Sequence, residues 1–136
     1  MQQVVLYVIT AVVFLAADVA WIKLWVRPLF EAHVNELLLD EFRAAPAVGF
    51  YALYVVGLLY FASAAGLNGK PLMRVAFDGA AYGFLCYGTY ALTNYATLKG
   101  WHPTMVASDL FWGTAASALF AVLGVVITRA VLPAPN

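Results

Sequence analysis

Charged residues are scarce in this chain, since Asp, Glu, Lys and Arg make up only 10% of its 136 residues while 65% are hydrophobic. A soluble domain carries about 25% charged residues, so the composition excludes a soluble globule, and it excludes a disordered chain as well. Seven basic residues balance seven acidic ones, which leaves no positive surplus to attract nucleic acid. The single cysteine, Cys86, excludes an internal disulfide scaffold.

Long apolar stretches are present instead, at residues 3–26, 47–66, 75–99 and 105–132. Each reaches the roughly 20 residues that an α-helix needs to cross about 30 Å of hydrocarbon. They predict an all-α polytopic membrane protein whose single domain, residues 1–136, is a bundle of four transmembrane helices. The first stretch lacks a preceding Lys or Arg and contains Asp18, so we interpret it as a span and not as a secretory signal.

The segment between the first two stretches, residues 28–45, mixes apolar and polar side chains at helical spacing. It begins at Pro28, a favoured first helical residue, and ends before Pro46. This pattern is typical of an amphipathic helix that lies on the membrane surface. We therefore expect such a surface segment after the first span.

Basic residues are distributed too evenly over the connections to orient the chain. An even number of spans places both termini on one side of the membrane. Three basic residues lie on that side and four on the other: Lys70, Arg74 and Arg129 against Lys23, Arg27, Arg43 and Lys99. Because orientation follows the excess of Lys and Arg in cytoplasmic loops, the in/out orientation stays open.

Small residues recur at every fourth position in the last two stretches. Gly79 and Gly83 form such a pair in the third stretch, and Gly113 and Ser117 form one in the fourth. Small residues let helix backbones approach closely in a membrane. The pattern predicts close helix packing, either within one bundle or across a homodimer interface.

Two acidic residues stand inside the apolar stretches, although a carboxylate costs about 2.5 to 3.5 kcal/mol at the bilayer centre. At a rise of about 1.5 Å per residue, Asp18 lies about 12 Å inside the end of the first span, and Asp109 about 6 Å inside the start of the fourth. These two span ends open on the same membrane face. We therefore expect both carboxylates in one leaflet, where they could share a pocket.

Further polar side chains are predicted at the same level. The third span reaches it with Tyr90 and Asn94, and the second span enters from that face with Tyr51 and Tyr54. Hydroxyl and amide groups at this depth could donate hydrogen bonds to the two carboxylates. We therefore count all four residues as candidate ligand-binding residues.

Each acid is followed three residues later by a tryptophan. The two matches, Asp18 with Trp21 and Asp109 with Trp112, share the pattern Ala-Ala/Ser-Asp-x-x-Trp. Residues three apart lie on one helix face, so each carboxylate has an aromatic neighbour in the candidate site. Trp25, nearer the end of the first span, is typical of an interfacial belt residue.

Several functions are compatible with this cluster of acids, tyrosines and tryptophans. A small cationic or hydroxyl-bearing ligand or a lipid headgroup could bind there, and proton-coupled transport through a homodimer is the most concrete form of that idea. The Asp pair could alternatively serve as acid and base in a lipid-modifying membrane enzyme. The chain could also be an accessory or assembly subunit of a larger membrane complex, or the polar groups could simply fix the helix register.

No metal or cofactor is expected. The two histidines, His33 and His102, each lack a second histidine at helical spacing. The sequence also has no glycine-rich phosphate loop, nucleophile elbow or haem-attachment motif. Whether the chain is an enzyme therefore stays open.

Three strings carry a resemblance to a known family: Asp-x-x-Trp at 18–21, Tyr-Ala-Leu-Thr-Asn-Tyr-Ala-Thr-Leu-Lys-Gly-Trp at 90–101, and Asp-Leu-Phe-Trp-Gly-Thr at 109–114. With these strings the chain resembles a family of small bacterial membrane proteins catalogued as domain of unknown function 2177. The likeness runs over nearly the whole chain. It implies a multi-pass, four-helix protein of the bacterial inner (cytoplasmic) membrane, and it implies no activity.

Overall fold

The computed structural model describes residues 1–133, which fold into helices joined by turns, with no strand in this range. The helices are α1 (Gln2–Trp21), α2 (Arg27–Val34), α3 (Ala44–Leu58), α4 (Ala64–Leu67), α5 (Leu72–Thr97) and α6 (Pro103–Val131). Wider π-helical turns, Ile22–Val26 and Leu59–Ser63, join α1 to α2 and α3 to α4, and a short 3-10 turn, Asn35–Leu37, follows α2. The described chain therefore forms four rods: α1 with α2, α3 with α4, α5, and α6.

Three of these rods are long and apolar enough to cross a membrane, namely Gln2–Leu37, Ala44–Leu67 and Pro103–Val131. The fourth rod, α5, has 26 residues and is thus about 39 Å long, although Arg74 and Asp78 make its first turns more polar. The predicted fold class, an all-α membrane helical bundle, is confirmed.

The segment after the first span differs in extent from the surface helix expected over residues 28–45. Its helix continues α1 through the π-helical turn, ends at Leu37 and leaves residues 38–43 outside any helix. The wider turn accommodates Pro28, which has no N–H to donate to the preceding turn. The sequence pattern indicated that a separate helix begins at Pro28. In the structure the helix runs through Pro28 without a break, so that expectation was wrong.

Protein covers the apolar side of α2. The ring of Phe30 packs edge-on against Trp101 with centroids 5.2 Å apart, and Val34 is only 4% exposed. Phe30 and Val34 belong to a hydrophobic cluster with Met105, which lies in the first turn of α6. Because burial against protein replaces contact with lipid, α2 is held against the start of α6.

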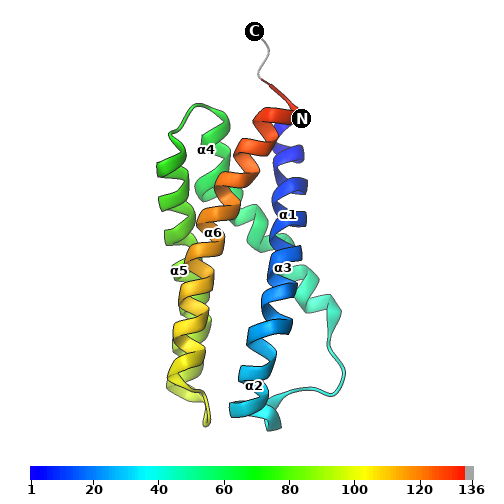
Figure 1. The fold of residues 1–136 in the computed structure, drawn as a ribbon, viewed down its shortest axis with the longest axis vertical. Helices are drawn as coiled ribbons and strands as arrows, with labels where there is room; N and C mark the ends of the chain where they lie inside the picture. The colour runs from blue at the N-terminus through cyan, green and yellow to red at the C-terminus, as the bar shows by residue number, and fades with distance from the viewer. Residues whose placement is uncertain (134–136) are drawn as a thin grey trace.

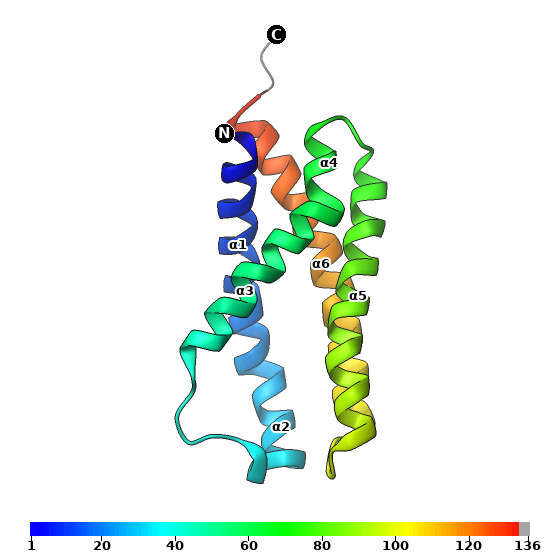
Figure 2. The same cartoon turned by 180° about the vertical axis from the view of Figure 1, so that it is seen from behind.

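The start of α1 and the end of α6 lie at the same end of the molecule, as an even number of helical rods requires (Figure 1). Gln2 Nε2 donates a hydrogen bond to the carbonyl oxygen of Leu132 at 3.1 Å, which ties these ends together. α5 and α6 run antiparallel and side by side, whereas α3 crosses α1 obliquely (Figures 1 and 2). This crossing brings Tyr51 and Tyr54 of α3 against Phe14 of α1.

α5 and α6 approach each other closely. A side-chain carbon added to Gly83 would collide with the carbonyl oxygen of Gly113, and one added to Gly79 would lie 2.8 Å from the carbonyl oxygen of Ser117. A carbon added to Gly113 would meet the ring of Tyr87 on α5. The small residues that the sequence singled out thus face one another between two helices of the same chain.

Candidate functional site

Asp18 on α1 is 4% exposed, and its carboxylate joins three helices. Tyr51 of α3 donates a hydrogen bond to Oδ2, and Trp112 of α6 donates one from Nε1 to Oδ1 at 2.6 Å. Both carboxylate oxygens therefore have a donor. Hydrogen bonds to a charged group contribute about 1.5–3 kcal/mol each, so Asp18 acts as a junction that positions α1, α3 and α6.

Asp109 on α6 is 8% exposed, but its surroundings differ from those of Asp18. Its Oδ2 atom is buried and has no hydrogen-bond partner among residues 1–133. Asp109 is three residues before Trp112, the residue that donates a hydrogen bond to Asp18. Because a buried polar atom without a partner costs free energy, the packing of the described chain gives no reason for an acid at this position.

Three tryptophans stack beside the two acids. Trp21 lies parallel to Trp112, with ring centroids 4.6 Å apart and an interplanar angle of 3°, and Trp25 stacks on Trp21 at 5.9 Å. Trp25 Nε1 donates a hydrogen bond to Ser108 Oγ at 2.5 Å. Trp21 Nε1, by contrast, is buried and has no partner in the described part of the chain.

The remaining predicted residues lie around this cluster. Tyr54 is 3% exposed and shares a hydrogen bond with Ser117 Oγ. Tyr90 is 50% exposed and packs edge-on against Trp101, with centroids 5.6 Å apart. Asn94, one turn further along α5, is partly exposed. Hydrogen bonds and ring stacking join four of the other predicted residues, Asp18, Trp21, Tyr51 and Trp112, and Asp109 lies one helical turn before Trp112.

Sequence reasoning missed the contact between Trp25 and Ser108. Trp25 lies four residues after Trp21, and Ser108 directly precedes Asp109. Helical spacing could have placed both residues near the cluster. At 47% exposure, Trp25 combines a surface position with a hydrogen bond that holds the first rod against α6.

Basic side chains do not neutralise either acid within the residues that the structure describes. The ion pairs there are Arg27–Glu31 at 2.8 Å, Lys70–Asp78 at 2.6 Å and Arg74–Asp78 at 2.9 Å. Over residues 1–133 there is also no group of three or more side chains that could hold a metal ion. The cluster therefore offers hydrogen-bonding and aromatic groups with acidic character.

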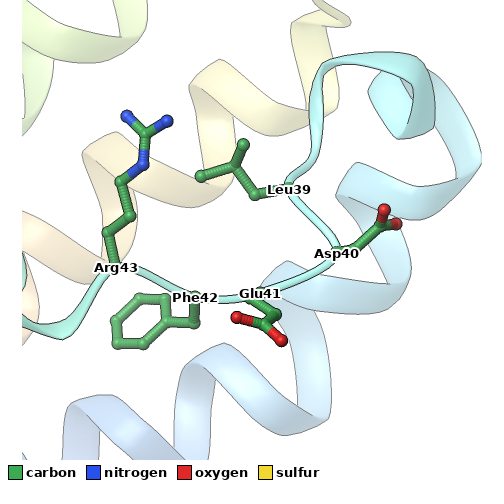
Figure 3. Close-up of a pocket in the computed structure, with 5 residues that line it drawn as sticks. All are labelled: Leu39, Asp40, Glu41, Phe42 and Arg43. Carbon is green, nitrogen blue, oxygen red and sulfur yellow. The ribbon is translucent and has the colours of Figure 1, made fainter.

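Asp109 lines neither of two concavities on the described part of the chain. A groove of about 200 Å³ between α1 and α3 is mostly apolar and includes Tyr51 and Phe14 in its lining. An open hollow of about 540 Å³ is formed by residues 39–43. Figure 3 shows that the charged side chains of this hollow, such as Asp40 and Arg43, point in different directions, so they do not form a joint binding site.

Comparison with known proteins identifies the family. The family model described as "Predicted membrane protein (DUF2177)" matches residues 3–126. The chain belongs to this family. No curated protein and no solved structure matches this DUF2177 member significantly. The matched range contains both acids, all three stacked tryptophans and the glycine contacts between α5 and α6.

Proposed function

We propose that the cluster around Asp109 binds a small ligand that bears a hydroxyl group or a positive charge, and that a lipid headgroup is the form best suited to a membrane. The observation that carries this proposal is the buried Oδ2 atom of Asp109, which lacks a partner among residues 1–133. A hydroxyl or a cation would supply the missing interaction. The cost of keeping this acid buried would then be recovered in the bound state.

The position of Asp109 favours entry from one membrane face. Asp109 is six residues after Pro103, the first residue of α6, which corresponds to about 9 Å along the helix axis. A headgroup or a solute would therefore need to move inward by only about two helical turns. Aromatic rings beside the acid, in Trp21 and Trp112, would line the path with flat apolar surfaces.

The proposal extends to proton-coupled transport and to the membrane in which the protein is located. Exchange of a proton for the ligand at Asp109 would be the step on which proton-coupled transport depends, since acids within membrane spans commonly serve as proton relays. The bacterial inner membrane is the proposed location. It is supported by the apolar helices and by the family resemblance described above.

The Asp109→Asn variant is expected to bind at least about tenfold more weakly than the unsubstituted protein, because one charge-assisted hydrogen bond or ion contact is lost. The full-length protein would be held in a polyacrylate amphipol, which carries neither alcohol nor ammonium groups. Tryptophan fluorescence would be followed during titration with monooctanoylglycerol, which carries hydroxyls, and with octyltrimethylammonium, which carries a positive charge.

Asp78→Asn is the matched control, because Asp78 is an acid paired with Lys70 and Arg74 away from the cluster. Its affinity for both probes should stay within about twofold of that of the unsubstituted protein. Methyl octanoate, which has neither head group, reports binding to the apolar surface alone. The proposal fails if neither probe saturates more tightly than this ester, or if Asp109→Asn leaves both affinities unchanged.

A further inference from the structure

The two Asp-x-x-Trp strings face each other from antiparallel helices, but only half of a reciprocal pairing is made. Trp112 of the second string donates its indole N–H to Asp18 of the first at 2.6 Å. The opposite pair consists of Trp21 of the first string and Asp109 of the second. In this pair both Trp21 Nε1 and Asp109 Oδ2 are buried and lack a partner among the described residues.

The indole N–H of Trp21 and the carboxylate of Asp109 both lie between two contacts that join the first rod to α6. Going along the first rod, Asp18 meets Trp112, and about two turns later Trp25 meets Ser108, one turn nearer the start of α6. Since α6 runs in the opposite direction, Trp21 faces the stretch of α6 from Ser108 to Trp112, which contains Asp109. The stacking of Trp21 on Trp112 at 4.6 Å, one turn from Asp109, agrees with this register.

The chemistry of the two atoms selects one kind of ligand group. An indole N–H only donates, and a carboxylate oxygen accepts. A hydroxyl satisfies both at once, because its oxygen accepts from Trp21 while its proton is donated to Asp109. A primary ammonium cannot accept from Trp21, and a quaternary ammonium can neither donate nor accept. A phosphate would be repelled by the two neighbouring carboxylates, for which no basic partner is present within residues 1–133.

We propose that Trp21 Nε1 and Asp109 Oδ2 together bind a single hydroxyl group of an uncharged alcohol. This inference rests on the proposed function and narrows it, because it selects the hydroxyl over the cation. The alcohol could belong to a neutral lipid, such as a monoacylglycerol, or to a free polyol, since both present the same group to the site.

The test compares probes that differ only in their hydroxyls, with calorimetry of the full-length protein in polyacrylate amphipol. Monooctanoylglycerol is expected to bind at least about tenfold more tightly than its dimethyl ether, in which both hydroxyl protons are replaced by methyl groups. Free glycerol distinguishes the source of the alcohol. A weaker response to glycerol than to the octanoyl ester indicates a lipid, and an equal response indicates a polyol, so either result supports the hydroxyl site.

Trp21→Phe keeps a stacking ring and removes the N–H, so the affinity for monooctanoylglycerol should fall about tenfold. Trp101→Phe is the matched control, because the Nε1 atom of Trp101 is likewise buried without a partner among residues 1–133 but lies in the separate hydrophobic cluster with Val34 and Met105, and its affinity should change by less than about twofold. The comparison of the ester with its dimethyl ether uses unsubstituted protein, so it stands even if a variant folds poorly.

Other outcomes separate this inference from the proposed function. If octyltrimethylammonium binds through Asp109 as tightly as the glycerol ester does, and Trp21→Phe has no effect, the site binds cations and the hydroxyl assignment is wrong. If no probe binds, a direct contact or a permanent water fills the gap, and the inference and the proposed function both fall.

Discussion

Gly83→Ala is expected to lower the free energy of unfolding by about 3 kcal/mol, at the upper end of the usual cost of overpacking. The added carbon would collide with the carbonyl oxygen of Gly113 and with Ser117 Oγ. A backbone carbonyl inside α6 cannot turn aside, so the two helices would have to separate along their shared interface. Ser117 also shares a hydrogen bond with Tyr54, which carries the disturbance to α3. Unfolding by sodium dodecyl sulfate in mixed micelles, followed by circular dichroism, measures the change.

Gly49→Ala is the control for this substitution, because a side-chain carbon at Gly49 would have nothing within 4 Å. Alanine is the better helix former by roughly 0.5–1 kcal/mol, so this variant should be as stable as the unsubstituted protein or slightly more stable. Equal stability of the two alanine variants would show that the close approach of α5 and α6 is not required for the fold.

The level of the acids within the bundle could be worked out from the sequence, because helical rise converts residue number directly into depth. Counting from the span ends placed Asp18 and Asp109 toward the same membrane face, and in the structure Asp18 is bonded to Trp112, three residues after Asp109. The helical period likewise placed each tryptophan beside its acid. These inferences need only regular helix geometry, which long apolar segments in a membrane are obliged to adopt.

Helix tilt, and with it the hydrogen-bond partner of each side chain, could not be predicted from helical rise and period. Tyr51 and Tyr54 both lie in the first turns of the second span, and only the oblique crossing of α3 over α1 decides that Tyr51 reaches Asp18 while Tyr54 meets Ser117. Tilt is set by packing against neighbouring helices, and hydropathy does not contain that information. The π-helical turn before Pro28 escaped prediction for a similar reason, since the sequence pattern of a proline suggests a helix start.

The two acids look equivalent in the sequence but have different hydrogen-bond partners in the structure. Each occupies the third position of the shared pattern and each is at least 92% buried, with exposures of 4% and 8%. Only Asp18 has a donor for both oxygens. Asp18 therefore stabilises the fold, whereas Asp109 costs stability, which is why the proposed ligand site is placed at Asp109. Groups that are maintained at a cost to stability are typical of functional sites.

Asp18→Asn is therefore expected to destabilise the protein by about 2–3 kcal/mol, while Asp109→Asn should change its stability by less than about 1 kcal/mol. An asparagine at position 18 can accept from the Trp112 indole and donate its NH₂ to the Tyr51 hydroxyl oxygen, so two hydrogen bonds to a carboxylate are replaced by weaker bonds to an amide and the Tyr51 proton loses its acceptor. At position 109 the same change removes a carboxylate that has no partner for Oδ2 among residues 1–133. Unfolding of both variants in ligand-free mixed micelles measures the difference. Comparable losses at the two positions would mean that Asp109 also holds the fold together, and the division of roles between the two acids would be wrong.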